Sequence, residues 1–186
     1  LGDQLSWGHP ALRQADPDTT VVILAEVREE ANYVRHNRHK IALLFSAMRH
    51  FAEALEERGY QVAYYPYEES HPSLLAACEQ AQKQWHYERL LICEPGEYRL
   101  LEQMQGWSDA LGVSVELLED TRFLASRQDF SDWASGRKQL RMEYFYRDMR
   151  KRYGLLMDAD QPEGGKWNYD ADNRTGWREQ CEIPLR

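Results

Sequence analysis

Short runs of aliphatic and aromatic residues alternate along the chain with longer segments in which apolar residues recur at helical spacing. The short runs occupy residues 21–25, 62–65, 90–93 and 113–117. Each run is rich in residues that favour extended structure, so each predicts a strand. Because strands that alternate with helices join through right-handed crossovers, the pattern predicts an α/β fold with a parallel sheet.

The segments between these runs predict helices. In the first, apolar residues recur three or four positions apart up to a stop at Gly59; they are Ile41, Leu44, Phe45, Met48, Phe51, Ala52 and Leu55. His71 and Pro72 predict the start of a second helix, with proline at its first position. A third helix is predicted through residues 101–111 and ends at Gly112.

Beyond residue 117 the pattern becomes helical. Ser126 and Asp129 have the spacing of a capping box, which predicts a helix that ends before Gly136. A longer helix is expected up to Gly154. Residues 155–186 are rich in Pro, Gly, Asn and Asp, and we expect an extended linker whose partner domain is absent.

The start of the chain indicates a further strand. Residues 1–4 resemble the last position of a buried strand and the loop that follows it, so we expect the natural chain to begin earlier. A preceding strand would complete a sheet of five. The expected fold class is therefore α/β: a Rossmann-like five-stranded parallel sheet flanked by helices, followed by helices and an extended interdomain linker.

Composition narrows the class of protein. The 186 residues are 42% hydrophobic, enough for a buried core, and the net charge of −8 excludes a globally basic nucleic-acid binder. Three cysteines without a CxxC pair argue against a disulfide framework or a zinc site and favour the cytoplasm. Residues 1–10 lack the apolar stretch typical of a secretory signal, and no apolar run approaches the roughly 18 residues that a membrane helix needs.

Acidic and amide side chains follow the predicted strands. Gly2, Asp3 and Gln4 follow the inferred first strand, Glu26 follows the next, and residues 94–97 follow the strand at 90–93. The carboxyl ends of parallel strands form the usual ligand edge, and the absence of a phosphate-binding glycine motif favours a donor-rich, phosphate-poor ligand. The alternative is that Asp3 and Glu26 cap helices or satisfy turns.

Residues 137–152 carry seven basic residues against two acidic ones. Arg137, Arg141 and Arg152 are expected near one helical face, which suits either phosphate binding or a solvated surface. His36 and His39 have a spacing that can chelate a metal, but no third ligand accompanies them, which favours a solvated helix start. No nucleophile motif is present, and we expect no self-sufficient active site.

Many spaced motifs resemble one family, the deoxyribodipyrimidine photolyase-related proteins, which are iron–sulfur bacterial cryptochromes and photolyases. They lie at residues 1–5, 33–36, 40–42, 45–51, 94–97, 122–124, 133–138, 142–147, 154–157 and 164–170. The resemblance implies that residues 1–154 are the α/β antenna domain and residues 155–186 the interdomain linker. The helical domain that binds FAD and a four-cysteine iron–sulfur cluster would be absent, leaving a fragment that is not catalytic by itself.

The resemblance also implies ligands and site residues. The antenna chromophore would be 6,7-dimethyl-8-ribityllumazine, held by Gly2, Asp3, Gln4, Glu26, Val27, Glu30, Tyr33, Ile41 and Leu44. Its excitation would pass to reduced FAD, which repairs (6-4) photoproducts by electron transfer. The expected partners are UV-damaged DNA and the protein's own FAD-binding domain, with Arg137, Lys138, Arg141 and Arg174 contacting DNA. Alternatives are a photoreceptor without repair and a stand-alone nucleotide-binding or interaction module.

Overall fold

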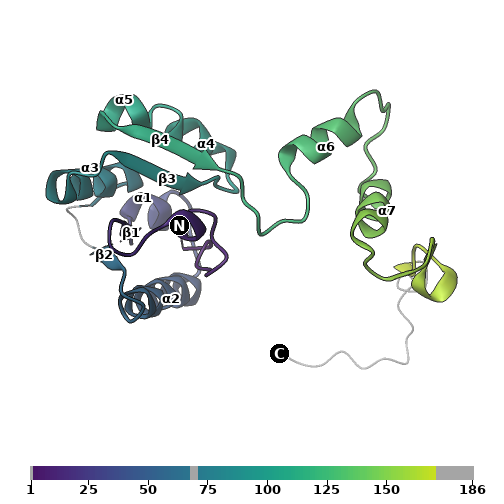
Figure 1. The fold of residues 1–186 in the computed structure, drawn as a ribbon, viewed down its shortest axis with the longest axis horizontal. Helices are drawn as coiled ribbons and strands as arrows, with labels where there is room; N and C mark the ends of the chain where they lie inside the picture. The colour runs from purple at the N-terminus through teal and green to yellow at the C-terminus, as the bar shows by residue number, and fades with distance from the viewer. Residues whose placement is uncertain (1, 68–70, 171–186) are drawn as a thin grey trace. The chain divides into compact units, whose positions relative to one another are not determined.

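Two pairs of parallel strands frame the first part of the chain in the computed structural model, which describes residues 2–67 and 71–170 (Figure 1). Strand β1 (Val21–Ala25) pairs with β2 (Gln61–Tyr65), and β3 (Arg89–Cys93) pairs with β4 (Ser114–Leu118). By its internal contacts the chain divides into two units, Leu1–Phe123 and Leu124–Arg186. All four strands lie within one residue of the runs that predicted them.

The prediction of a five-stranded parallel sheet is wrong. The described residues form three two-stranded sheets, of which two are parallel and one is antiparallel. Between β1 and β3 lies a cavity of about 720 Å³ that both strands line along their whole length. Residues 2–20 place only turns and a 3-10 helix, η1 (Leu12–Gln14), before β1, so no described strand joins the two pairs.

Helices cover both faces of the β1–β2 pair. On one face, Leu24 packs with Ala52 and Leu55 of α2 (Arg38–Glu56). On the other face, Ala63 and Tyr65 pack with Ala77 and Ala81 of α3 (Leu74–Trp85). Because successive strand residues point to opposite faces, this arrangement buries both sides of the pair and explains why β1 is apolar throughout and β2 largely so.

One face of the β3–β4 pair is covered by α3 and by two further helices, α4 (Tyr98–Met104) and α5 (Trp107–Leu111). The sequence predicts one helix here, but Gly106 interrupts it. Similarly, Pro72 does not open α3, because the Ser73 hydroxyl caps it by accepting from the N–H of Ala76. Gly112 adopts the left-handed conformation that ends α5, as predicted.

The second unit contains α6 (Arg127–Ala134), α7 (Met142–Tyr153), and a short antiparallel pair of β5 (Met157–Asp158) and β6 (Gln161–Pro162), followed by η2 (Glu163–Gly165). The rings of Phe130 and Trp133 on α6 pack against Phe145 on α7. The predicted linker region therefore begins with a hairpin. In the described part of the chain, no helix has the length and apolar character needed to cross a membrane.

The predicted capping box at the start of α6 is confirmed. Ser126 accepts from the N–H of Asp129, and the Asp129 carboxylate accepts from the N–H of Ser126. Arg152 also binds Asp129, and these contacts lower the pKa of Asp129 to about 2.

Replacing Ser126 with alanine is therefore expected to destabilise α6 by about 1 kcal/mol, because the N–H of Asp129 loses the hydroxyl that accepts its hydrogen bond. Hydrogen exchange of the α6 amides measures the effect. Ser131, which is exposed in the middle of the same helix, provides the control. Ser131→Ala should change the exchange free energies by less than about 0.5 kcal/mol, and equal effects of both substitutions would contradict the capping role.

Candidate functional site

The carboxyl ends of β1 and β3 each lead into an acidic segment and then a helix. Glu26 and Val27 follow β1 and precede α1 (Arg28–Asn32), after which Tyr33 is the first residue. Residues 94–97 follow β3 and precede α4. Contacts between α1 and α4 bring Glu29 and Glu30 of α1 close to Glu97, the last residue before α4.

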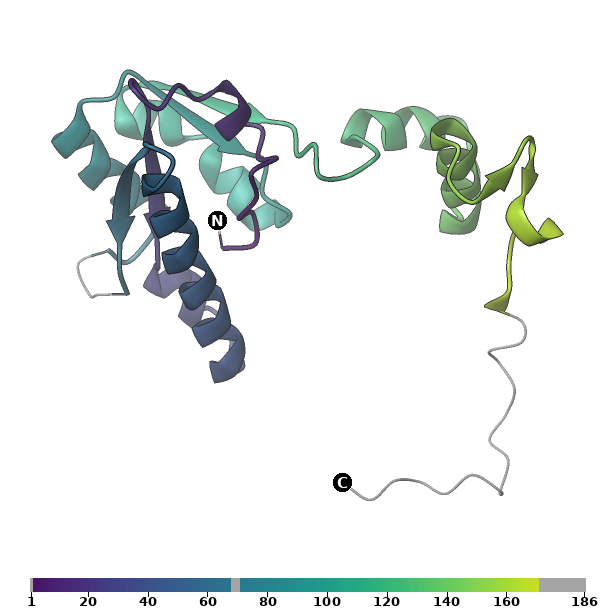
Figure 2. The ribbon, with the colours of Figure 1, turned by 60° about the horizontal axis from the view of Figure 1, so that its bottom comes forward.

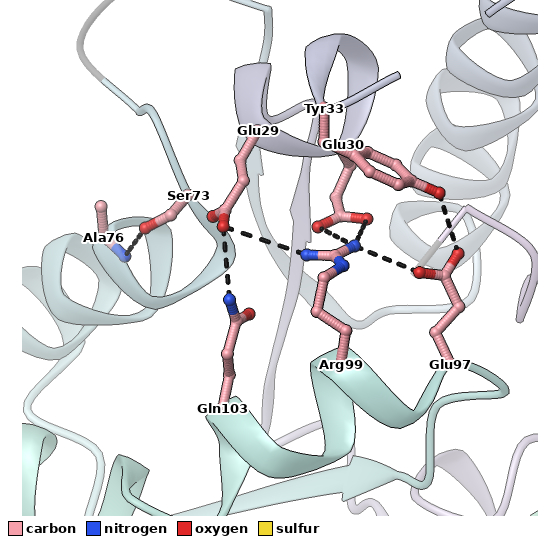
Figure 3. A network of polar contacts seen from close by, with 8 residues as sticks. All are labelled: Glu29, Glu30, Tyr33, Ser73, Ala76, Glu97, Arg99 and Gln103. Atoms are coloured by element: carbon pink, nitrogen blue, oxygen red, sulfur yellow. Dashed lines mark hydrogen bonds and ion pairs between the residues drawn. The ribbon is translucent and has the colours of Figure 1, made fainter. Parts of the chain in front are cut away.

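Arg99 of α4 is the centre of these contacts (Figure 3). Its Nη2 donates to both carboxylate oxygens of Glu30, at 3.0 and 2.8 Å, and to Oε2 of Glu97 at 3.2 Å. The guanidinium carbon lies 4.6 Å from the centre of the Tyr33 ring. The hydroxyl of Tyr33 in turn donates to Glu97 at 3.4 Å. We call Glu30, Tyr33, Glu97 and Arg99 the α1–α4 cluster.

Two further residues border the α1–α4 cluster. Glu29 lies 3.9 Å from Nη1 of Arg99 and accepts a hydrogen bond from Gln103 at 3.4 Å. Glu29, Glu30 and Glu97 thus surround a single guanidinium, and the hydrogen bonds that Arg99 donates to Glu30 raise the pKa of Arg99 above its ordinary value. The local charge stays negative, which suits a ligand that offers hydroxyl and N–H donors.

Glu26 is fully buried and has four hydrogen bonds. Arg49 of α2 donates to it from Nε at 2.7 Å and from Nη2 at 2.9 Å, and the N–H of Tyr67 donates at 2.9 Å. The hydroxyl of Tyr64 is the fourth donor. Burial by itself raises the pKa of Glu26, but these hydrogen bonds outweigh it and hold the pKa below its ordinary value of 4.5.

These hydrogen bonds indicate that Glu26 stabilises the fold. A carboxylate has about four lone-pair positions, and here each has a donor from the protein. The side chain therefore ties β1 to α2 and to the end of β2. Of the two interpretations left open by the sequence, the geometry favours the one in which Glu26 satisfies its own surroundings.

The segment that starts the described chain lies beside α2 (Figure 2). A Cβ on Gly2 would come within 3.3 Å of Sδ of Met48 and 3.9 Å of Cβ of Leu44, so this position requires close backbone approach. Gln4 is buried, and its Nε2 donates to the carbonyl oxygen of Glu94 at 2.9 Å. The carbonyl oxygen of Asp3 accepts from Arg122 at 2.5 Å.

The remaining predicted ligand residues differ in exposure. Val27 is 2% exposed and belongs to the core, whereas Tyr33 is 45% exposed. Ile41 and Leu44 are half-buried on α2. The structure thus connects Glu30 with Tyr33, Gly2 with Leu44, and Gln4 with the segment after β3, while Glu26 and Val27 are enclosed by protein.

The predicted DNA contacts lie in the second unit. Arg137, Lys138 and Arg141 are exposed, but they precede α7 and do not share a helical face with Arg152, because α7 begins only at Met142. Arg137 packs its guanidinium 4.4 Å from the Trp133 ring and lies 3.8 Å from Asp148. The fourth predicted contact, Arg174, lies outside the described residues.

The described residues contain no cluster of metal ligands, and their two free cysteines are buried. No group of three or more His, Cys, Asp or Glu residues there has a geometry that would hold a metal ion. Burial raises the pKa of Cys78 to about 12 and that of Cys93 to about 11, so both thiols are protonated at neutral pH. Cys181 lies outside the described residues.

Sequence reasoning missed Arg99 and Arg49. Arg49 lies within the family motif at residues 45–51, and Arg99 lies just after the motif at residues 94–97. The sequence assigned neither arginine a structural or binding role. Their partners are distant in the chain: Arg99 is 69 positions from Glu30, and Arg49 is 23 from Glu26. The signal that could have indicated Arg99 is a single arginine in the first turn of a helix that follows an acidic strand end.

Comparison with known sequences supplies the family. The model of one family, described as deoxyribodipyrimidine photo-lyase-related protein, matches residues 1–186. A protein named (6-4) photolyase from Agrobacterium fabrum is 46% identical over 176 residues, which cover 94% of this chain and 35% of that protein. An uncharacterized protein of Acanthamoeba polyphaga mimivirus is 29% identical over 168 residues, 86% of this chain and 84% of that protein. The chain therefore spans about a third of the photolyase it matches and most of the viral protein.

Proposed function

Since this chain belongs to the deoxyribodipyrimidine photolyase-related family, we propose that it is part of a light-dependent DNA repair protein that acts on (6-4) photoproducts. The observation that carries the proposal is the 46% identity to a (6-4) photolyase over 94% of the chain. Flavin and an iron–sulfur cluster would be held by protein outside residues 1–186. In this proposal, the present chain binds an antenna chromophore and contributes to DNA binding.

The proposed chromophore is 6,7-dimethyl-8-ribityllumazine, at the edge formed by the carboxyl ends of β1 and β3. When bound, it would absorb blue light and pass the excitation to the flavin. Three observations support the fit: the α1–α4 cluster offers carboxylate acceptors for ring N–H groups and ribityl hydroxyls, Tyr33 is exposed, and Gly2 allows close backbone approach. Glu30 and Tyr33 would contact the ligand, and Glu26 would maintain the strand end that carries them.

The proposed DNA contribution comes from the segment between α6 and α7. Lys138 and Arg141 are exposed there, and exposed cations bind phosphates without reading sequence. Arg137 would approach the backbone while stacked on Trp133. These contacts would orient DNA, and the lesion chemistry would belong to the flavin.

A repair assay tests the proposed function. The native protein that contains residues 1–186 is incubated with an oligonucleotide carrying a (6-4) photoproduct, with reduced flavin, in blue light and in darkness. We expect repair in light only. A protein that absorbs blue light but leaves the lesion intact would be a photoreceptor, and one that neither absorbs nor repairs would be a binding module; either result contradicts the proposal.

A further inference from the structure

Arg99 connects four side chains of the α1–α4 region through one guanidinium. It binds Glu30 and Glu97, lies 3.9 Å from Glu29, and packs against the ring of Tyr33 (Figure 3). Both Glu30 and Tyr33 belong to the proposed chromophore site, whereas no role has been assigned to Arg99. Its side chain is one-third exposed, so it lies at the boundary between protein and solvent where a ligand would bind.

Among the described residues, three carboxylates and the Tyr33 ring hold the guanidinium. Both terminal nitrogens face carboxylates, while Nε is buried and has no hydrogen-bond partner in the described structure. A buried donor without a partner is costly, so its surroundings must compensate for that cost. The compensation here comes from Glu30, Glu97 and the Tyr33 ring, which means that the position of Arg99 and the positions of these groups depend on one another.

We propose that Arg99 is a positioning residue of the chromophore site, which fixes the carboxylate of Glu30 and the ring of Tyr33 in the orientation that binds the lumazine. This inference rests on the proposed function. With Arg99 in place, both oxygens of Glu30 are oriented by one nitrogen, and their outward lone pairs accept from ligand hydroxyls. Without it, three carboxylates repel one another and the Glu30 rotamer is no longer fixed.

Lysine cannot replace arginine in this role. A lysine ammonium is a point charge on a flexible stem, whereas the guanidinium is planar, donates from several nitrogens and stacks on an aromatic ring. Arg99→Lys therefore retains the charge while removing the simultaneous contact with Glu30, Glu97 and Tyr33. It separates a requirement for positive charge from a requirement for positioning.

The test titrates the 186-residue chain with 6,7-dimethyl-8-ribityllumazine and follows its fluorescence. Arg99→Lys and Arg99→Gln should each raise the Kd about tenfold, which corresponds to about 1.4 kcal/mol. Gln103→Ala is the matched control, because Gln103 lies on the same helix and contacts Glu29 but neither Glu30 nor Tyr33. Its Kd should stay within about twofold of the unsubstituted chain.

A double substitution distinguishes positioning from general stabilisation. In a Glu30→Gln background, Arg99→Lys should raise the Kd by clearly less than about tenfold, because one of the two groups that Arg99 orients has already been altered. Additive effects of the two substitutions, or an unchanged Kd in Arg99→Lys, would overturn the role of Arg99 while leaving the proposed function intact. If the unsubstituted chain fails to bind lumazine, the antenna assignment and this inference fall together, whereas repair by the native protein is measured independently.

Discussion

Replacing Glu26 with alanine is expected to lower the free energy of unfolding of the first unit by about 2–4 kcal/mol. Glu26 is fully buried and accepts four hydrogen bonds, so its removal leaves the Tyr64 hydroxyl and the N–H of Tyr67 without their partner. The guanidinium of Arg49 is more than half exposed and regains water, which is why the estimate stays below the full cost of breaking a buried ion pair. Urea unfolding followed by circular dichroism measures the change.

Glu116 provides a matched control because it is an exposed glutamate in a strand of the same unit. Glu116→Ala should change stability by less than about 0.5 kcal/mol. A loss of stability in Glu26→Ala no larger than in this control would show that the four hydrogen bonds contribute nothing and would contradict the structural role of Glu26.

The same carboxylate predicts a pH dependence. The folded pKa of Glu26 lies below its ordinary value of 4.5, so the unfolded chain takes up a proton more readily than the folded one. Its contribution to stability is therefore fully present above pH 4.5 and declines as the pH falls through the folded pKa. The difference in stability between the unsubstituted chain and Glu26→Gln should narrow over this acidic range.

Replacing Glu30 with alanine is expected to weaken lumazine binding about 5- to 150-fold, since a carboxylate that accepts a hydrogen bond in a partly enclosed site contributes about 1–3 kcal/mol. The loss has two sources: the ligand loses an acceptor, and Arg99 loses the partner that it binds at 2.8 Å. Lumazine fluorescence during titration measures the affinity. In the native protein, repair should persist under light that the flavin absorbs directly, because the antenna increases light capture without performing the electron transfer.

Glu29→Ala is the control for this substitution. Glu29 is the neighbouring residue of the same helix but stays 3.9 Å from Arg99, so its removal should weaken binding by less than about threefold. The competing interpretation is that Glu30 only anchors α1 to α4. A Glu30→Ala variant that is less stable but binds lumazine with unchanged affinity would support that interpretation and contradict the ligand contact.

Local features of this fold were predictable from the sequence. The capping box of Ser126 and Asp129 and the left-handed glycines Gly112 and Gly154 follow from short-range rules, and the structure confirms each of them. Errors at helix starts were also local: the hydroxyl of Ser73 provides a better cap than the preceding Pro72 allows. Such features depend on a few neighbouring residues, which a single sequence contains.

The sheet and the candidate site depend on contacts between residues far apart in the sequence, and the sequence predicted both of them less well. The alternation of strands and helices indicates parallel pairing but does not determine which strand edges meet, and β1 and β3 remain separated by a cavity. The family resemblance assigned Glu30 and Tyr33 to one ligand site, and the structure connects them through Arg99 and Glu97. The enclosure of Glu26 arises from Arg49 and Tyr64, and nothing in the spacing of these residues indicates it.

Equilibrium dialysis of the 186-residue chain against 6,7-dimethyl-8-ribityllumazine, at low and high inorganic phosphate, tests the chromophore site most directly. The α1–α4 cluster is rich in acceptors and has more carboxylates than cations, so it should bind the lumazine saturably and exclude phosphate. The expected result is close to one lumazine per chain, with an affinity that phosphate leaves unchanged. Absence of saturable binding, or displacement of the lumazine by phosphate, would contradict the site proposed at the ends of β1 and β3.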